Sequence, residues 1–270
     1  MPEIPDLEAI RGFLEPRTAG HLVTRTEVRY PWLIRSEDKM ESLEGHALGP
    51  IGRYGKFLLF TVDDGRRLVV NPMLTGRFHW AVAGERKRPG TCVVLGFDDG
   101  NELRYSDARR MGRWYLVPAD GLDLIPQWAS LGPDALAITE DEFLAGLKKH
   151  RGQAKNVLTN QEFMAGIGNA CSDEILWEAR IHPHRRVATL DEEQRRGLFL
   201  AMHAVFDWAR PILEAEVRDG LYQRNEEWRD HLRVHRKAEQ ACPRCGSTIR
   251  SQVQSSRETD YCLTCQPLAL

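Results

Sequence analysis

The segment Cys242-Pro243-Arg244-Cys245 is separated by sixteen residues from the segment Cys262-Leu263-Thr264-Cys265, and this pattern determines how the C-terminal part of the chain folds. Two such pairs supply four thiolates, the ligand set of a tetrahedral structural Zn²⁺ ion. A closed four-cysteine site leaves no open position for catalysis. We therefore expect one structural zinc ion, bound by Cys242, Cys245, Cys262 and Cys265. Residues 247–261 between the pairs fit a β-hairpin, which would hold Arg257 near its tip.

Length and composition limit the remaining possibilities. The chain has 270 residues and a normal share of apolar side chains, enough for two domains of ordinary size. No apolar run is long enough to cross a bilayer, and residues 1–10 carry acids where a secretion signal needs bases. We expect a cytoplasmic protein with no membrane partner, whose paired cysteines bind metal rather than form disulfides.

The formal net charge of −2 does not by itself indicate a nucleic-acid partner. Binding depends on where the charges lie, however, and not on their sum. Residues 148–186 contain seven Lys or Arg against four Asp or Glu, and three further cations precede the first cysteine pair: Arg233, Arg236 and Lys237. This distribution is compatible with a basic face on a nearly neutral protein.

A short helix is predicted at residues 5–14. Pro5 suits the first helical position, and acidic residues follow it in the first turn, where they favour the positive end of a helix. Leu7, Ile10 and Leu14 recur at helical spacing and lie on one face. The predicted helix therefore has a buried side directly after the N-terminus.

Three further patterns follow this helix. Short β-rich runs separated by Gly and Asp turns indicate antiparallel strands in a sandwich, and these runs are residues 21–30, 57–62, 67–73, 90–97 and 113–118. A proline-rich stretch at 117–134 indicates a linker. Helical patterns then occupy residues 141–149, 160–180 and 190–218.

These patterns predict an α+β multidomain protein. An antiparallel β-sandwich with an N-terminal helix comes first, and a helical domain with a four-cysteine β-hairpin zinc finger comes last. The expected bounds are 1–117 for the sandwich domain, 118–134 for the linker, 135–232 for the helical domain and 233–270 for the zinc finger.

The N-terminus offers covalent chemistry. Removal of Met1, which a small second residue permits, would expose the secondary amine of Pro2. An α-amino group has an ordinary pKa of about 7.7–8.0, so a useful fraction is an uncharged nucleophile near neutral pH. Attack of this amine on C1′ of a deoxyribose would give an iminium ion, an electron sink for elimination. Glu3 is placed to act as a general acid on the sugar ring oxygen.

The segment Gly166-Ile167-Gly168-Asn169 lies between two helical patterns. Its glycines permit a tight turn and close backbone approach to another molecule. The helix N-terminus that follows can bind a phosphate, and Asn169 can both cap that helix and donate to the anion.

Taken together, these features resemble the formamidopyrimidine-DNA glycosylase/endonuclease VIII family over almost the whole chain. The family shares an N-terminal Pro-Glu followed by a helix, a lysine after a glycine at a strand, a helix–two-turn–helix (H2TH) motif and a zinc finger with a flanking arginine and glutamine. The matching stretches are Pro2-Glu3-Ile4-Pro5-Asp6, Gly55-Lys56-Phe57-Leu58-Leu59, Gly166 to Glu174 continuing to Ile181-His182-Pro183, Arg257, and Gln266.

The resemblance implies a bifunctional enzyme, an N-glycosylase with a β,δ-elimination lyase activity, acting on damaged duplex DNA as a monomer near the bacterial nucleoid. Pro2 would be the Schiff-base nucleophile, and Glu3 the acid that opens the deoxyribose. The residues expected to contact phosphates next to the lesion are Lys56, Lys155, Asn169 and Arg257.

The resemblance also implies a wedge that fills the gap left by a flipped base. Leu74 and Met111 would insert into the duplex from two loops. Arg109 would face the orphaned base, and Arg110 would contact a phosphate.

The chain departs from the family pattern at several positions. Asp6 stands where the family has a second glutamate, and the altered wedge loop Asn71-Pro72-Met73-Leu74 makes Met73 an alternative wedge. Residues 219–232 look too short for a long lesion-capping loop, and the zinc-finger segments at 245–247 and 255–257 look closer to endonuclease VIII. These two features favour oxidised pyrimidines, ring-opened bases or hydantoins as lesions.

Two other functions fit part of the sequence. A non-catalytic binder of damaged or abasic DNA would retain the fold and the phosphate contacts, and the altered wedge loop leaves room for it. A zinc-ribbon adaptor for protein partners would explain the cysteines, but it leaves the N-terminus and Gly168-Asn169 without a role.

Overall fold

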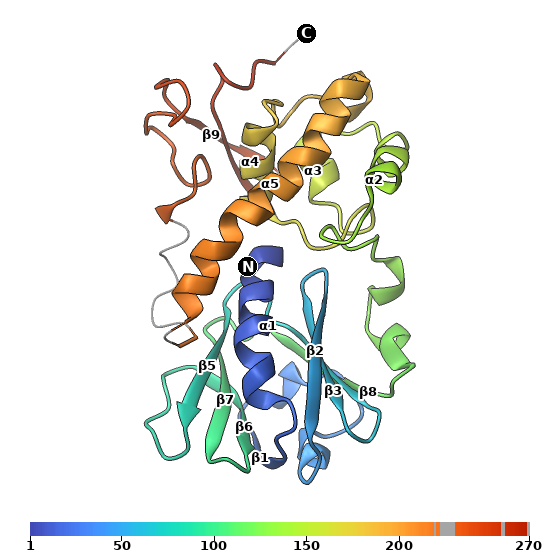
Figure 1. The fold of residues 1–270 in the computed structure, drawn as a ribbon, viewed down its shortest axis with the longest axis vertical. Coiled ribbons are helices and arrows are strands. Elements are labelled where there is room, and N and C mark those ends of the chain that lie inside the picture. Colours follow the sequence, from blue (N-terminus) through green and yellow to red (C-terminus); the bar gives the residue numbers. More distant parts are fainter. Residues whose placement is uncertain (219, 222–229, 255–256, 269–270) are drawn as a thin grey trace. The chain divides into compact units, whose positions relative to one another are not determined.

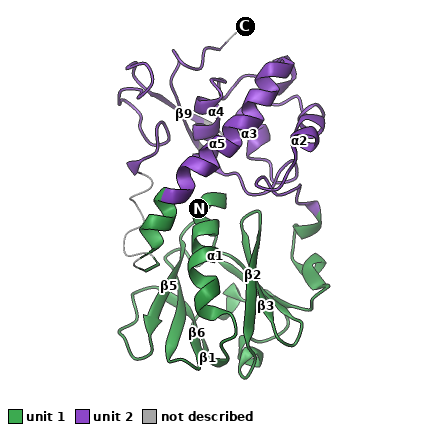
Figure 2. Cartoon of the chain, viewed as in Figure 1, with its two compact units in different colours: residues 1–129, 212–225 green, residues 130–211, 226–270 purple. Residues whose placement is uncertain are grey.

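The computed structural model describes residues 1–270 except 219, 222–229, 255–256 and 269–270, and it divides into two compact units (Figures 1 and 2). Unit 1 comprises Met1–Ala129 and Ile212–Asn225, and unit 2 comprises Ser130–Pro211 and Glu226–Leu270. The sequence pattern placed residues 212–225 with the helical domain. They join unit 1 because Val217 and Leu221 pack against the sandwich core.

Unit 1 is an antiparallel β-sandwich, as the sequence predicted. One sheet has the strand order β1-β6-β7-β5 and the other the order β2-β3-β4-β8. The strands are β1 Val23–Val28, β2 Leu48–Tyr54, β3 Phe57–Val62, β4 Arg67–Asn71, β5 Gly76–Val82, β6 Thr91–Phe97, β7 Asn101–Asp107 and β8 Arg113–Val117. Short 3-10 helices lie at Pro31–Leu33, Met40–Leu43, Gly121–Leu124 and Trp128–Ser130.

The first helix, α1, spans Ile4–Thr18 and completes the sandwich core. In Figure 1, α1 lies between the labelled strands of the two sheets. The predicted apolar face is confirmed, since Leu7, Ile10 and Leu14 are all buried and join residues of both sheets in one core. The helix is thereby packed into the sandwich core along this face.

Three strands that the sequence pattern did not single out are β2, β5 and β7. β2 contains Pro50, which removes a backbone donor, but it lies at an edge of its sheet, where proline is tolerated. β7 carries Glu102 and Arg104, which pair with each other at 2.6 Å and are buried. A strand is predicted from alternating apolar and polar residues, in which charged side chains are expected to be exposed. A strand with buried charged side chains is therefore missed.

Unit 2 contains four helices among its described residues and a two-stranded hairpin. The helices are α2 Glu140–Leu147, α3 Ala154–Leu158, α4 Asn169–Glu178 and α5 Glu192–Val217, of which the part after Pro211 belongs to unit 1. A 3-10 helix lies at Val187–Thr189, and the hairpin pairs β9 Arg250–Gln254 with β10 Arg257–Tyr261. The predicted helical domain and zinc-finger hairpin are thus confirmed.

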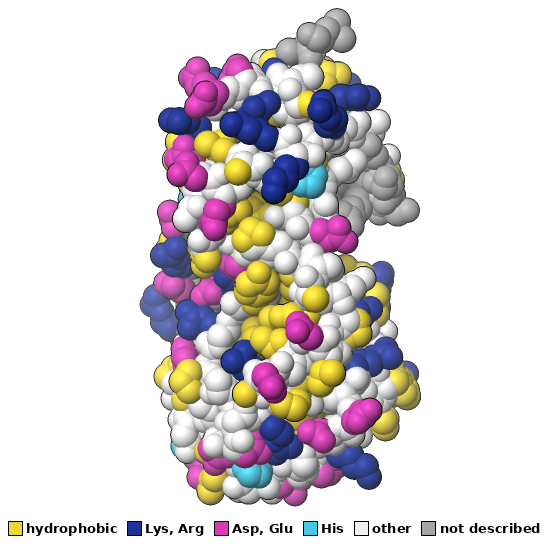
Figure 3. All heavy atoms as spheres, turned by 90° about the vertical axis from the view of Figure 1, so that its right-hand side faces the viewer, with side chains coloured by type: hydrophobic (Ala, Val, Ile, Leu, Met, Phe, Trp, Pro, Cys, Tyr) yellow, Lys and Arg dark blue, Asp and Glu magenta, His cyan; other side chains and the backbone are white. Residues whose placement is uncertain are grey.

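On the face drawn in Figure 3, basic, acidic and hydrophobic side chains are interspersed, so neither sign of charge covers that face. A continuous basic surface is not visible on it. None of the helices in the described ranges has both the length and the apolar character that crossing a bilayer requires.

Candidate active site and nucleic-acid interface

Pro2 and Glu3 stand at the positive end of α1. Both are buried, and Glu3 occupies the N-cap position of the helix. Asp6 accepts a hydrogen bond from the Glu3 backbone N–H at 2.8 Å. The shorter side chain at position 6 therefore has a defined contact, which holds Glu3 at the start of the helix.

Lys56 lies in the two-residue turn that joins β2 to β3. Gly55, the first residue of this turn, has a φ of 55°, which glycine adopts without strain. Arg53 ties the turn to α1, since its Nε donates to Glu8 at 2.6 Å and its Nη1 donates to the Gly55 carbonyl at 3.0 Å. The Arg53 side chain is buried, and the sequence pattern gave no sign of its role. This pair of contacts fixes the Lys56 turn relative to the helix that follows Pro2.

The two predicted wedge loops lie in unit 1. Residues 72–75 join β4 to β5, and residues 108–112 join β7 to β8. Leu74 and Met111 are exposed apolar side chains, at 36% and 37%. One residue in each loop has an unusual left-handed backbone conformation: Met73 and Arg110 both have a φ of 52°. Such strain in a non-glycine residue persists only where the surroundings hold it in place.

Asp107, a buried carboxylate at the end of β7, holds both wedge loops. It accepts backbone N–H bonds from Met111 at 2.8 Å and Gly112 at 2.7 Å, and a third from Arg109 at 3.1 Å. The Thr75 hydroxyl, from the other loop, also donates to Asp107, and the Arg109 N–H lies 3.1 Å from the Thr75 oxygen. One carboxylate therefore organises the backbone on both sides of the predicted wedge.

The charge of Asp107 is stabilised by these donors. Burial alone raises its pKa, but the hydrogen bonds from Thr75, Gly112 and Met111 outweigh burial and leave the pKa below the ordinary value of 3.8. The carboxylate is therefore ionised at neutral pH and accepts from every donor around it.

Tyr105 packs beneath the same two loops. Its hydroxyl lies 3.1 Å from the Pro72 carbonyl and 3.2 Å from Asp107. A Cβ atom added to Gly76 or Gly112 would lie within 2.1 Å of that hydroxyl oxygen, so only glycine fits at either position. Both loops are thus packed against one buried phenol.

Unit 2 contains a separate group of predicted site residues, at the start of α4. Gly168 occupies the N-cap position, so the expectation that Asn169 caps the helix is wrong. Asn169 is the first helical residue, and its Nδ2 donates to the Glu258 carbonyl on β10 at 2.9 Å. The amide side chain thereby joins the H2TH turn to the zinc-finger hairpin, one residue from Arg257.

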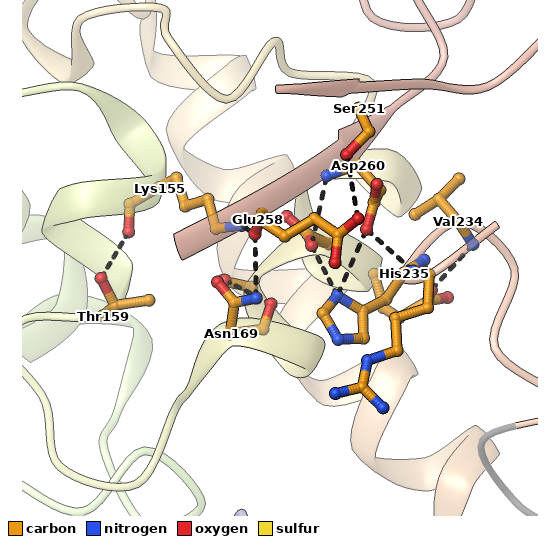
Figure 4. A network of polar contacts seen from close by, with 12 residues as sticks. Lys155, Thr159, Asn169, Val234, His235, Ser251, Glu258 and Asp260 are labelled. Carbon is orange, nitrogen blue, oxygen red and sulfur yellow. Dashed lines mark hydrogen bonds and ion pairs between the residues drawn. The ribbon is translucent and has the colours of Figure 1, made fainter. Parts of the chain in front are cut away.

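Lys155 belongs to a buried polar network that reaches this junction (Figure 4). Its Nζ is 2.6 Å from Asp173 and 2.8 Å from the Glu258 carbonyl, the same oxygen that Asn169 contacts. The other oxygen of Asp173 lies 2.8 Å from Nδ1 of His235. The Lys155 ammonium group thus contacts two buried oxygen atoms, and its expected contact with a phosphate stays a prediction.

Glu174, the next residue on α4, is fully buried and anchors the segment before the first cysteine pair. It accepts from the backbone N–H groups of Val234 and His235 at 2.9 and 3.0 Å, and from that of Arg233 at 3.1 Å. The Arg233 side chain also contacts Glu174 at 3.1 Å. The basic segment noted in the sequence is therefore bound to α4.

Arg257 begins β10, opposite Gln254 in the register of the hairpin. Its side chain lies outside the described residues, as does most of the segment 219–232 where a lesion-capping loop was considered. The expected roles of both stay predictions.

The four cysteines of the predicted zinc site come together. Their sulfur atoms all lie within 4.8 Å of one another, with Cys242 and Cys265 at 3.9 Å and Cys245 and Cys262 at 3.4 Å. Zn–S bonds of about 2.3 Å in a tetrahedron require S–S separations of about 3.8 Å. The residues fit one structural zinc ion.

Gln266 follows the fourth cysteine and is buried. It joins the second cysteine pair, Cys262 and Cys265 with the residues between them (the second knuckle), to the end of the H2TH motif. Its Nε2 donates to the Ile181 carbonyl at 2.9 Å, and its Oε1 accepts from the Cys262 N–H at 2.9 Å. His182, beside Ile181, is also buried, which lowers its pKa to about 4, and its Nδ1 accepts from the His184 N–H at 3.2 Å. A neutral imidazole is therefore part of this packed junction.

Three family models match the chain in the order of these modules. The formamidopyrimidine-DNA glycosylase N-terminal domain matches residues 1–114, the formamidopyrimidine-DNA glycosylase H2TH domain matches 131–215, and the zinc finger found in FPG and IleRS matches 239–268. The fold and the site thus define a zinc-finger DNA glycosylase built on an H2TH domain.

Proteins named formamidopyrimidine-DNA glycosylase resemble the chain over nearly its whole length. The one from Desulforamulus reducens is 32% identical over 281 residues, covering 98% of this chain and 99% of the relative. The one from Symbiobacterium thermophilum is 35% identical, covering 99% and 90%. The chain belongs to the formamidopyrimidine-DNA glycosylase family.

Solved structures agree with this assignment. A Lactococcus lactis FPG mutant in complex with Fapy-dG-containing DNA has a TM-score of 0.88 and 28% identity, covering 98% of this chain and all of that one. The MutM (FPG) protein of Thermus thermophilus has a TM-score of 0.85 and 28% identity, covering both chains fully.

Proposed function

We propose that this protein is a bifunctional DNA glycosylase and abasic-site lyase that uses Pro2 as its nucleophile. The observation that carries the proposal is the construction of the N-terminus. Pro2 and Glu3 are buried at the positive end of α1, Asp6 binds the Glu3 backbone, and Arg53 ties the same helix to the Lys56 turn.

The proposed reaction begins after Met1 has been removed. The Pro2 nitrogen forms a bond to C1′ of the damaged nucleotide, the base leaves with its electron pair, and Glu3 supplies a proton to the sugar ring oxygen as the ring opens. The resulting iminium ion acidifies the C2′ proton, whose loss expels the 3′ phosphate. A second elimination then expels the 5′ phosphate, and hydrolysis of the iminium by water frees Pro2 and the sugar fragment, leaving a one-nucleotide gap between two phosphates.

The phosphate contacts are divided between the two units. In unit 1 the candidate is Lys56, and in unit 2 the candidates are Asn169, the N-terminus of α4 and Arg257. Lys155 supports this second group indirectly, because its ammonium group binds the Glu258 carbonyl next to Arg257. We assign it a positioning role.

The wedge is proposed to be Leu74 and Met111, with Arg109 facing the orphaned base and Arg110 near a phosphate. Both apolar side chains are exposed on loops that Asp107 holds in place. An exposed apolar side chain on a constrained loop is what a base-step wedge requires.

The proposed substrates are ring-opened purines in the duplex DNA of a bacterial chromosome, which would bring the protein to the nucleoid. The relatives described above, both named for formamidopyrimidine, favour this class over the oxidised pyrimidines that the zinc-finger sequence suggested. A panel of duplexes carrying a formamidopyrimidine, a hydantoin or an oxidised pyrimidine ranks these lesions.

The test is cleavage of a labelled duplex that carries one formamidopyrimidine. Wild-type protein should give a product ending in a 3′ phosphate, whereas Pro2→Gly and Glu3→Gln should lower base excision by about 10³-fold or more while duplex binding is retained. A non-catalytic binder would bind the duplex and leave it intact in all three proteins, and that result would refute the proposal.

A further inference from the structure

A buried tryptophan contacts the zinc site. Trp177, near the end of α4, donates its indole N–H to Sγ of Cys242 at a distance of 3.4 Å. The two side chains are 5% and 2% exposed, and both belong to one small core with Val234, Ile249 and Cys262. The contact is therefore shielded from water, which would otherwise compete with the N–H···S hydrogen bond.

The indole is fixed in the orientation that points its N–H at the sulfur. The guanidinium carbon of Arg244 lies 3.7 Å from the ring centre, and its Nη1 donates to the Trp177 carbonyl at 2.7 Å. Arg233 approaches the same ring at 4.8 Å. Since Arg244 lies between Cys242 and Cys245, the first cysteine knuckle and the tryptophan hold each other in place.

The two knuckles are attached to the H2TH motif in different ways. Gln266 holds the second knuckle through backbone groups, at Cys262 and Ile181. Trp177 instead contacts a sulfur atom that would bind the metal. Hydrogen bonds from outside the ligand set orient metal ligands, and their loss typically lowers metal affinity by about 10–100-fold.

We propose that Trp177 is a zinc-retaining residue, whose indole N–H orients the Cys242 thiolate and slows loss of the metal. Trp177 lies on α4, the helix that Asn169 begins, so the zinc site is joined to the element for which a phosphate contact is proposed. The inference depends on the zinc site and not on the covalent chemistry proposed for Pro2.

The test compares Trp177→Phe with Trp208→Phe. The first variant removes the N–H and keeps an aromatic ring. The second is a matched control, because Trp208 packs on the same Arg233, at 4.5 Å, on α5. Zinc release from purified holoprotein into excess 4-(2-pyridylazo)resorcinol should be about 10–100-fold faster for Trp177→Phe and unchanged for Trp208→Phe. Release at the wild-type rate from both variants would overturn the proposal.

A second measurement uses the wild-type sequence, so it tests the proposal even if Trp177→Phe fails to fold. In protein loaded with ¹¹³Cd and labelled with ¹⁵N-tryptophan, an N–H···S–Cd bond should give a through-bond correlation between one indole proton and the metal. A correlation at the Trp177 indole supports the proposal. Its absence in the folded, cadmium-loaded protein contradicts it.

Discussion

Each unit has one buried carboxylate that holds its predicted site residues in place, and the two carboxylates have different partners. Asp107 in unit 1 binds mainly the backbone N–H groups of the loop that follows it. Asp173 in unit 2 binds charged or ionisable side chains, Lys155 and His235, from segments that are distant in sequence. The first arrangement holds two loops of unit 1 mainly through backbone groups and the Thr75 hydroxyl, whereas the second joins α3, α4 and the segment before the zinc finger through side chains.

This difference predicts how substitutions at the two carboxylates affect stability and function. Loss of a carboxylate from the Asp107 site leaves backbone donors that water can reach once the exposed loops relax. Loss of the charge at Asp173 leaves a buried ammonium without its counter-ion, which costs more. Substitutions at Asp107 should therefore alter the wedge with a moderate loss of stability, and substitutions at Asp173 should destabilise unit 2 as a whole.

The largest effect is expected for Asp173→Asn. Removing one partner of a buried ion pair typically costs about 3–5 kcal/mol, and here it also weakens the contact to His235. Denaturant unfolding should show this loss. The double variant Asp173→Asn, Lys155→Met should recover part of it, because the unpaired charge is gone; equal stability of single and double variants would contradict an ion pair.

Asp107→Asn should lower the free energy of unfolding by about 1–3 kcal/mol. The carboxylate accepts from several donors with two oxygens, and the asparagine amide has only one acceptor oxygen. Its more specific effect is on base flipping. Excision of a formamidopyrimidine should fall by about 10-fold or more, while cleavage at a preformed abasic site falls less, because that site has no base to displace. Equal losses on both substrates would indicate a purely structural role.

The pH dependence of the Asp107 effect has a definite sign. Its pKa in the folded protein lies below the ordinary 3.8, so its stabilisation is fully present above about pH 4 and is lost as the pH falls through the folded-state value. The stability difference between wild type and Asp107→Asn should therefore be constant from pH 7 to about pH 5 and shrink below about pH 4. A difference that grew on acidification would contradict the assignment.

A smaller effect is expected for Arg257→Ala, with Arg250→Ala as the matched control on the same hairpin. If Arg257 contacts one phosphate, its removal should weaken duplex binding about 10-fold for any sequence and reduce the slope of log Kd against log salt by about 1. Arg250 lies at the opposite end of the two-strand register and should leave the slope unchanged. Identical slopes for all three proteins would remove Arg257 from the phosphate contacts.

The fold could be predicted where one residue type carries a strong local constraint. Four cysteines in two pairs predicted the zinc finger, and an apolar face predicted α1. The edge strand β2 was missed because Pro50 is a poor strand residue except at an edge, and edge position is a property of the whole sheet.

The candidate site could be predicted only in part. The motif residues were found, but the residues that position them were not. Asp107 and Trp177 act through partners that folding brings to them: backbone amides of a loop in one case and a cysteine 65 residues away in the other. Similarly, Lys155 matches a phosphate-binding position in sequence, and only the structure places its ammonium against Asp173.

The most direct test of the account is borohydride trapping on an abasic duplex, followed by peptide mapping of the adduct by mass spectrometry. If Pro2 is the nucleophile, the deoxyribose fragment is attached to the N-terminal peptide, on Pro2, in protein that has lost Met1. Attachment to a lysine, or an active protein that retains Met1, would contradict it.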